Sequence, residues 1–171
     1  ESKGLSRIGS NGKITHYGLA QGLPNERLYT VFADSNNAVW VGTASGLARI
    51  QNGRVQAFTK ANGLPEGAIY AILQSPEGGL FLGTHHGLYK VLNGKFTAVK
   101  GVPDEAVISL SIDKLSNLWI GTVNRGILRL GPRGLEALDA TAGLPNNRVS
   151  SLYNDREGNL WAGTNAGLVR F

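Results

Sequence analysis

Trp119-Ile120-Gly121-Thr122 is the stretch that decides the fold, because its pattern of aromatic, aliphatic or small residue, glycine and threonine occurs four times. The other copies begin at Trp40, Phe81 and Trp161, so the steps between successive copies are 41, 38 and 42 residues. A period of about 40 residues is typical of β-propellers, in which each repeat forms one small antiparallel sheet. We therefore interpret the chain as a succession of repeats.

Two further motifs keep the same phase. A Gly-Leu or Gly-Ile pair follows each copy, and a Gly-Leu-Pro or Gly-Val-Pro turn precedes it. The pairs begin at Gly46, Gly87, Gly126 and Gly167, and the turns begin at Gly22, Gly63, Gly101 and Gly143. This phase predicts a single propeller domain or propeller fragment over residues 1–171, with repeats at about 1–21 (partial), 22–62, 63–100, 101–142 and 143–171 (partial).

Each complete repeat predicts four short strands, called A to D here. Strand A follows the Gly-x-Pro turn, strand B carries the aromatic motif, strand C begins near the Gly-Leu pair, and strand D returns after a hairpin. Asn52-Gly53 and Asn93-Gly94 mark two of these hairpins, since Asn-Gly between apolar runs favours a tight two-residue turn. The predicted A strands are 28–33, 69–74, 107–112 and 149–154, and the predicted C strands include 47–50, 88–91, 127–130 and 168–171. The predicted fold class is all-β, with β-propeller blades built as four repeats of a four-stranded antiparallel meander.

Both ends of the sequence align with a strand C. Residues 1–8 align with residues 43–50, and residues 168–171 form the last strand C, so this strand type occurs once more than the others. A self-closed ring of four blades would leave two C strands competing for one place. We therefore expect a fragment of a larger ring, or four blades that complete a ring by self-association.

Several repeated side chains have predicted structural roles. The aromatic residues of the motif are expected to act as wedges between blades. One basic residue per strand C is expected to pack its stem and extend its charged head to solvent; these residues are Arg7, Arg49, Lys90, Arg129 and Arg170. Asp34, Asp113 and Asp155, with Ser75 in their place once, are interpreted as turn residues rather than catalytic groups.

Composition excludes several classes of protein. Hydrophobic residues make up 42% and charged residues 17%, which excludes disorder through excess charge, and no apolar run is long enough for a membrane helix. The 24 glycines disfavour a helical bundle. The net charge of +5 comes from basic residues spread singly along the chain, so no nucleic-acid partner is expected. With no cysteine there is no thiolate site, and because the chain begins Glu1-Ser2-Lys3 without methionine, we expect a mature region or an excised segment.

The order of motifs within each repeat resembles the two-component regulator propeller repeat. That order is a Gly-Leu-Pro turn, then a strand that ends in Asp, then Asn-Leu-Trp-Ile-Gly-Thr, and finally Gly-Ile-x-Arg. Its clearest copies are residues 117–122 and 159–164, and the resemblance covers essentially the whole chain. The sequence departs from the pattern at Phe81, Ser75 and Val102. The resemblance implies a periplasmic sensor, the extracytoplasmic part of a membrane-anchored bacterial protein whose output is a histidine kinase or a diguanylate cyclase, and it implies dimeric signalling.

The resemblance supplies no catalytic residues, so a site is inferred from topology. In a propeller the D-to-A and B-to-C connections emerge on one face, around the central channel, where ligands bind. Polar residues there that differ between repeats are the candidates for ligand binding: Arg27, Glu66, His85, His86, Asp104, Asn124, Arg125, Arg148 and Asn165. Adjacent His85 and His86 would point to opposite faces of a strand, and no third ligand has suitable spacing, so neither a metal site nor a cofactor is predicted.

Three functions remain open from sequence. The first is a sensor that binds a small polar solute or a glycan fragment and contacts the membrane only through its parent's anchor; this segment would not be an enzyme. The second is a passive scaffold for self-association or a protein partner. The third is a propeller lyase or hydrolase, with His86 as base and Glu66 or Asp104 as its partner.

Overall fold

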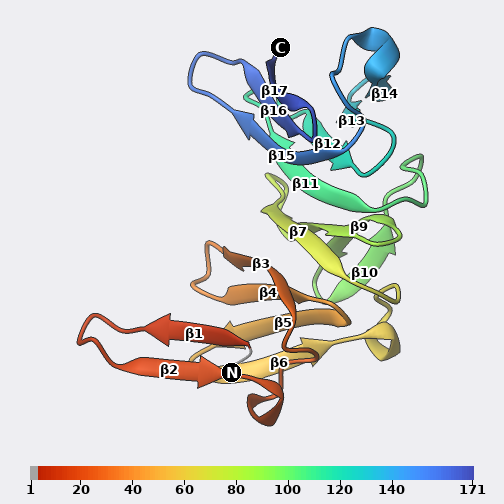
Figure 1. Ribbon diagram of the computed structural model, residues 1–171. Helices are drawn as coiled ribbons and strands as arrows, with labels where there is room; N and C mark the ends of the chain where they lie inside the picture. Colours follow the sequence, from red (N-terminus) through yellow and green to blue (C-terminus); the bar gives the residue numbers. More distant parts are fainter. Residues whose placement is uncertain (1–3) are drawn as a thin grey trace.

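The computed structural model describes residues 4–171, which form strands β1 to β17 in five antiparallel sheets. The sheets follow one another in chain order as a fan, and the first and the last sheet lie at its opposite ends (Figure 1). Strands adjacent in the sequence are also hydrogen-bonded neighbours in every sheet. The predicted all-β class and the predicted meander are therefore confirmed, while residues 1–3 of the first predicted repeat lie outside the described residues.

Three sheets are complete, and each has strands A to D in sequence order. They comprise β3 (Leu28–Ala33), β4 (Val39–Thr43), β5 (Gly46–Gln51) and β6 (Arg54–Phe58); β7 (Ile69–Gln74), β8 (Leu80–Thr84), β9 (Gly87–Leu92) and β10 (Lys95–Ala98); and β11 (Val107–Ile112), β12 (Leu118–Thr122), β13 (Ile127–Gly131) and β14 (Gly134–Leu138). These strands lie where the motifs predict them.

The first and last sheets are incomplete. The first has a strand C, β1 (Leu5–Ile8), and a strand D, β2 (Ile14–Tyr17). The last has strands A to C: β15 (Val149–Asn154), β16 (Leu160–Thr164) and β17 (Gly167–Arg170). Phe171, predicted as the end of the last strand, follows β17 but still exchanges two backbone hydrogen bonds with Leu160.

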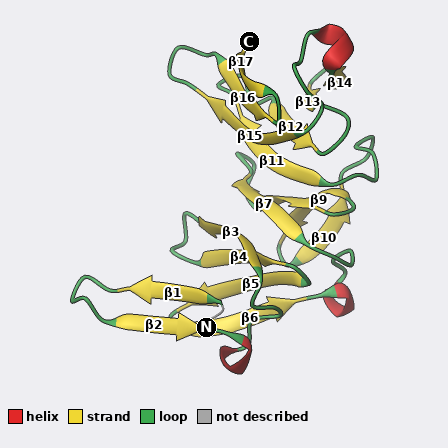
Figure 2. Cartoon of the chain, viewed as in Figure 1, coloured by secondary structure: helices red, strands yellow, loops and turns green. Residues whose placement is uncertain are grey.

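Short 3₁₀ helices fill three of the D-to-A connections (red in Figure 2). They are η1 (Leu19–Gln21), η2 (Lys60–Asn62) and η3 (Ala140–Ala142). Each ends at the glycine of a predicted Gly-Leu-Pro turn, and these glycines have φ values of 100°, 92° and 92°. The left-handed conformation is open to glycine without steric penalty, which explains why the turn begins with that residue.

Three aromatic motif residues, Trp40, Phe81 and Trp119, pack in the interfaces between successive sheets, as predicted, whereas Trp161 of the last sheet belongs to none of the buried clusters of residues 4–171. Trp40 stacks on Phe58 of its own sheet, with ring centroids 5.9 Å apart, and shares a buried cluster with Ile72 and Leu80 of the next sheet. This packing removes a large apolar ring from water. One motif aromatic therefore contributes to each of the three interfaces that follow the second sheet.

The glycine of the motif permits close approach between sheets. A Cβ atom at Gly42 would lie 2.5 Å from the carbonyl oxygen of Ile69, which belongs to strand A of the next sheet. Gly83 and Gly121 meet the carbonyl oxygens of Val107 and Val149 in the same way. Strand A of each sheet therefore presses against strand B of the preceding sheet at a position where only glycine fits.

The basic residues of strand C lie over the aromatic rings of their own sheets. Distances from the charged group to the ring centroid are 5.6 Å for Arg49 and Trp40, 5.6 Å for Lys90 and Phe81, 5.5 Å for Arg129 and Trp119, and 5.8 Å for Arg170 and Trp161. The Nε atoms of Arg49 and Arg129 are buried without a hydrogen-bond partner. In these two arginines the Nε side of the guanidinium group therefore packs on the indole, to whose π face it is attracted, while the Arg129 side chain stays 37% exposed.

No helix among residues 4–171 is long and apolar enough to span a membrane.

Candidate functional site

The D-to-A and B-to-C connections lie on one side of the sheets, as the topology predicts. Within the second complete sheet the backbone N–H of His85 donates to the carbonyl oxygen of Ala68 over 2.9 Å. Between sheets, the N–H of Gly87 donates to the carbonyl oxygen of Glu105 over 2.8 Å. These backbone hydrogen bonds hold both kinds of connection together, so side chains from different sheets can share one site.

Strand A of every sheet from the second to the last carries a β-bulge at this side. The register between strands A and B shifts around the second residue of strand A, which has no partner of its own. The bulged residues are Tyr29, Tyr70, Ile108 and Ser150. A bulge redirects a side chain out of the regular alternation, and here it redirects one from each of these sheets to the same side.

A cavity of about 850 Å³ opens where these side chains meet. All four bulged residues line it, and so do five of the candidates predicted from sequence: His85, His86, Asp104, Asn124 and Arg148. The remaining lining residues are Glu105, Ala106 and Val123. The lining thus comes from four consecutive sheets and their connections.

Aromatic rings form a row along one part of the cavity. The rings of Tyr29 and Tyr70 meet edge to face with centroids 4.9 Å apart. The Tyr70 hydroxyl lies 3.3 Å from Nδ1 of His85, whose ring centroid is 5.0 Å from that of His86. Arg27 extends the row at its far end, with its guanidinium carbon 5.4 Å from the Tyr29 centroid.

Charged groups of both signs lie beside the row. Nδ1 of His86 is 2.9 Å from Oδ1 of Asp104. Glu105 is the most enclosed of these charges, with its side chain 12% exposed; it accepts a hydrogen bond of 3.0 Å from Nε of Arg125 and another from the backbone N–H of Asn124. Glu105 therefore ties the B-to-C turn of the third complete sheet to the connection that precedes its strand A.

Four predicted residues do not line the cavity. Arg27 and Arg125 lie beside it through their contacts with Tyr29 and Glu105. Glu66 instead pairs with Lys60 at 2.7 Å on the surface, and this hydrogen bond lowers the pKa of the Glu66 carboxyl. Asn165 lies in the last sheet, where its backbone N–H donates to the carbonyl oxygen of Arg148.

Sequence reasoning missed the tyrosines and Glu105. The candidates were taken from the D-to-A and B-to-C connections, and Tyr29 and Tyr70 belong to strand A instead. One signal was available: the second residue of strand A varies among Tyr, Ile and Ser, whereas the first is always Leu, Ile or Val. The variable second position is the bulged residue, whose side chain points outward, and the uniformly aliphatic first position is the buried one.

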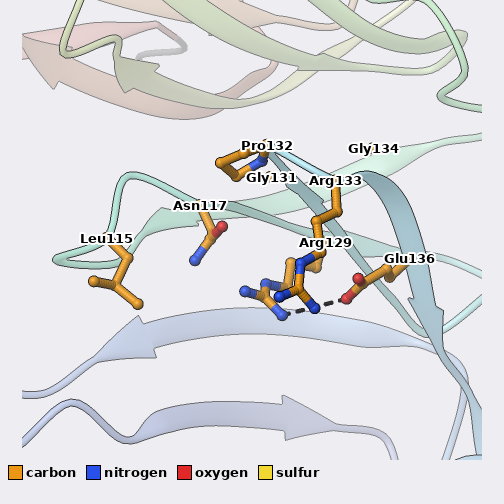
Figure 3. Close-up of a pocket in the computed structure, with 8 residues that line it drawn as sticks. All are labelled: Leu115, Asn117, Arg129, Gly131, Pro132, Arg133, Gly134 and Glu136. Carbon is orange, nitrogen blue, oxygen red and sulfur yellow. Dashed lines mark hydrogen bonds and ion pairs between the residues drawn. The ribbon is translucent and has the colours of Figure 1, made fainter.

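A second cavity, of about 320 Å³, lies beside the third complete sheet and is drawn in Figure 3. It is lined by Leu115, Asn117, Arg129, Gly131, Pro132, Arg133, Gly134 and Glu136, and Nη1 of Arg129 pairs with Oε2 of Glu136 at 3.2 Å. Its residues come from the A-to-B turn, strands C and D and the hairpin between them, all in a single sheet. We assign it to the internal packing of that sheet.

Among residues 4–171 no three His, Cys, Asp or Glu side chains are grouped closely enough to hold a metal ion.

The family model of the two-component regulator propeller matches residues 22–45 and 143–166. Each matched segment runs from a Gly-Leu-Pro turn to the turn after the Trp-x-Gly-Thr motif. The resemblance inferred from sequence is therefore confirmed for these segments. No curated protein matches the chain in sequence.

Several solved structures share the fold. The extracellular domain of a protein described as a hybrid two-component system of B. thetaiotaomicron superposes with a TM-score of 0.83 at 24% identity, covering 98% of this chain and 24% of the other. A second such domain from B. thetaiotaomicron gives a TM-score of 0.80 at 24% identity, covering 97% of this chain and 23% of the other. Virginiamycin B lyase from Staphylococcus aureus superposes with a TM-score of 0.74 at 20% identity, and the match covers 97% of this chain and 61% of the lyase. The chain thus spans about a quarter of the length of the two extracellular domains, and its fold is that of part of a propeller.

Proposed function

We propose that this chain is the ligand-sensing part of a propeller in a membrane-anchored bacterial signalling protein, of the two-component or cyclic-di-GMP type, and that it works in the periplasm. The matched propeller segments and the likeness to extracellular domains of hybrid two-component systems support this proposal. The ligand is a small polar solute or a glycan fragment.

One observation carries the proposal: the polar side chains that the repeats do not share converge on one cavity. The shared residues have structural tasks, such as the wedge of Trp40 and the close approach at Gly42. By contrast, His86, Asp104 and Arg148 occupy positions where packing imposes no residue type, yet all three line the same 850 Å³ space. A pocket with a few convergent polar groups is the usual form of a small-molecule site.

The lining favours a neutral or zwitterionic polar solute. Tyr29 and Tyr70 offer ring surface for stacking, and their edge-to-face contact holds both rings in place. Asp104 and Arg148 supply an acceptor and a donor in the same cavity as His86. A ligand with a ring face and several hydroxyl, amino or carboxyl groups can use all of these contacts.

Ligand binding would act on the arrangement of the sheets. The lining residues come from four sheets, so a ligand that bridges them binds best to one relative placement of those sheets. A ligand shifts a conformational equilibrium only by its difference in affinity for the two states. Contacts that span sheets provide such a difference, whereas contacts within one sheet would not.

Calorimetric titration of the chain with sugars, amino acids and small carboxylates tests the proposal. Arg148→Ala and Tyr70→Ala are expected to weaken binding of the active solute at least tenfold. Arg133→Ala is the matched control, because Arg133 is exposed beside the other cavity and should leave affinity unchanged. Absence of binding across the panel, or equal loss in all three variants, would favour the passive scaffold.

A lyase or hydrolase is supported by one contact, the 2.9 Å approach of His86 to Asp104. Of the two acids considered from sequence, Asp104 reaches the histidine, whereas Glu66 pairs with Lys60. If the pair acts as a general base, Asp104→Asn should abolish turnover of a bound ligand while preserving its affinity. Recovery of the ligand unchanged after prolonged incubation would exclude this candidate.

A further inference from the structure

Two opposite charges line the ligand cavity without pairing with each other. Asp104 lies in the D-to-A connection before the third complete sheet, and Arg148 lies in the connection before the last sheet. Among residues 4–171, Asp104 forms an ion pair with His86 and with no arginine, and no carboxylate pairs with Arg148. The cavity therefore presents an anionic and a cationic group that one ligand can reach separately.

The connection that carries Arg148 has its neighbouring turn on each side. The backbone N–H of Asn165, in the B-to-C turn of the same sheet, donates to the carbonyl oxygen of Arg148 over 3.3 Å. The N–H of Gly126, in the B-to-C turn of the preceding sheet, donates to the carbonyl oxygen of Asn147 over 2.9 Å. These turns, residues 122–126 and 164–167, contain no acidic residue. Neither neighbour therefore offers a carboxylate to the guanidinium group of Arg148.

Glu105, the other carboxylate of the cavity, is already engaged. It accepts hydrogen bonds from Nε of Arg125 and from the backbone N–H of Asn124. Because Arg125 and Arg148 match the two acids in number, the four charges cancel while the histidines are neutral. Asp104 repels a ligand with a net negative charge, and Arg148 repels one with a net positive charge. The charges of the site thus suit a ligand that is neutral overall but carries both signs.

His86 and Tyr70 complete the acidic end of the cavity. The carboxylate of Asp104 accepts the proton-bearing Nδ1 of His86 over 2.9 Å, so Nε2 of the neutral imidazole is an acceptor. The rings of His85 and His86 meet at 5.0 Å, and the Tyr70 hydroxyl lies 3.3 Å from Nδ1 of His85, so an aromatic ring lies near this end. A carboxylate, a bare imidazole nitrogen and a nearby aromatic face are suitable partners for an ammonium group on a ring-bearing molecule.

Asn124 supports the basic end. Its side chain lines the same cavity as Arg148, and its amide makes no hydrogen bond with other residues in the range 4–171. A guanidinium group and an amide N–H group can donate to the oxygens of one carboxylate. The basic end therefore has donors for a carboxylate and no carboxylate of its own.

We propose that the ligand of this cavity is a zwitterion with a ring-bearing body, the chemistry that free amino acids and short peptides share. Its ammonium group binds Asp104 and Nε2 of His86, its carboxylate binds Arg148, and its ring packs on Tyr70. This inference rests on the proposed sensor function and names the class of solute within it. An uncharged sugar would displace water from both charged ends without supplying a matching charge, so it should bind more weakly.

Calorimetric titration with free and blocked forms of the same compound tests the assignment. The probes are phenylalanine and the dipeptide phenylalanylglycine, each also with an acetylated amino group or an amidated carboxyl group, and cellobiose is the uncharged comparison. We expect a free zwitterion to bind, and blocking either end to weaken its affinity at least about tenfold, because a charge-assisted hydrogen bond is lost. The tighter of the two free compounds identifies the source as an amino acid or a peptide.

Two variants assign the ends of the tighter zwitterion. Arg148→Gln should weaken its binding about tenfold but leave the affinity of its amidated form unchanged, because that form has no carboxylate to lose. Asp104→Asn should weaken the free form and leave the affinity of the acetylated form unchanged. Arg133→Gln is the matched control, because it removes the same charge at an exposed position beside the other cavity.

The outcomes separate this inference from the sensor function. Equal affinity for free and blocked forms, or binding of cellobiose in their place, would overturn the zwitterion and leave the sensor function intact. An unchanged affinity of the free form in Asp104→Asn would contradict the ammonium site and favour the general-base role of that carboxylate. If sugars, amino acids and carboxylates all failed to bind, the sensor function itself would be lost, and this inference with it.

Discussion

The indole Nε1 of Trp119 donates a hydrogen bond of 2.9 Å to Oδ2 of Asp113, six residues earlier at the end of strand A. Oδ1 of the same carboxylate accepts from the backbone N–H groups of Leu115 and Asn117 and closes the turn. One side chain thus links the turn to the aromatic wedge. The same arrangement joins Asp34 to Trp40 and Asp155 to Trp161, at 2.8 Å in both cases.

The second complete sheet departs from the pattern at both ends of this link. Ser75 stands where the others have Asp, and Phe81 stands where they have Trp. Phenylalanine has no N–H to donate, so a carboxylate would have one partner fewer in this sheet. The replacement of Asp by Ser75 and the replacement of Trp by Phe81 therefore remove the two partners of the same hydrogen bond.

Asp113→Ser should destabilise the protein by about 1–3 kcal/mol, since the substitution leaves the partly buried indole N–H without its acceptor. Trp119→Phe should also destabilise it, but the double variant recreates the pair found in the second sheet. We expect the free energy of unfolding of the double variant to exceed, by about 1 kcal/mol, the value that the sum of the two single effects predicts. Urea unfolding of the four proteins measures this coupling, and strict additivity would contradict it.

Gly121→Ala should destabilise the protein by about 1–3 kcal/mol through overpacking. The added Cβ would lie 2.8 Å from the carbonyl oxygen of Val149 in the next sheet. Gly163→Ala is the matched control at the same motif position, because the three atoms nearest its Cβ all belong to serine side chains of its own sheet, Ser150 and Ser151. Thermal unfolding of both variants tests the contrast; equal losses would show that inter-sheet approach is not the cause.

Acid should destabilise the protein through the turn aspartates. Hydrogen bonds from Asn159 and then Trp161 lower the pKa of Asp155. Burial raises the pKa of Asp34 and of Asp113, but hydrogen bonds outweigh it and lower both. The unfolded chain then binds protons at a higher pH than the folded protein, so this stability is present above the ordinary Asp pKa of about 3.9 and is lost as pH falls below it.

Urea unfolding between neutral pH and about pH 3 measures that dependence. Asp155→Asn removes one of the three carboxyls and should flatten the decline in stability with acid. An unchanged pH dependence in this variant would show that Asp155 does not contribute to it.

Thr122→Val should cost about 1–3 kcal/mol, because the buried threonine hydroxyl donates to the carbonyl oxygen of Gly126 and accepts from the backbone N–H of Arg125, both over 2.9 Å. Valine keeps the shape but leaves the N–H of Arg125 without its acceptor, while the carbonyl oxygen of Gly126 keeps only the hydrogen bond from the backbone N–H of residue 122. Thr164→Val, at the same position of the last and more open sheet, should cost less because water can replace the hydroxyl. Chemical unfolding distinguishes the two, and a larger loss at Thr164 would contradict the explanation.

Much of the fold is predictable from local sequence. Asn93-Gly94 specifies a hairpin and Gly63 a left-handed turn through backbone conformations that depend on neighbouring residues alone. The period of the Trp-x-Gly-Thr motif gives the number and order of the sheets. About half of the candidate site was also predictable, because the topology of a propeller places residues such as His86 and Arg148 on one side.

The remaining site residues depend on contacts between sheets. Tyr29 and Tyr70 lie 41 residues apart, and their rings meet only because both strands carry a bulge and lie side by side. The pairing of His86 with Asp104, rather than with Glu66, depends likewise on the distance between two connections.

The repeated motifs by themselves determined the strand order, the turns and the aromatic wedges, since each follows from interactions within about 40 residues. Only the tertiary structure decided which polar side chains share a cavity and which aromatic rings meet beside it. Those outcomes depend on how closely and at what angle successive sheets stack, and that geometry arises from the summed packing of many side chains rather than from any local pattern.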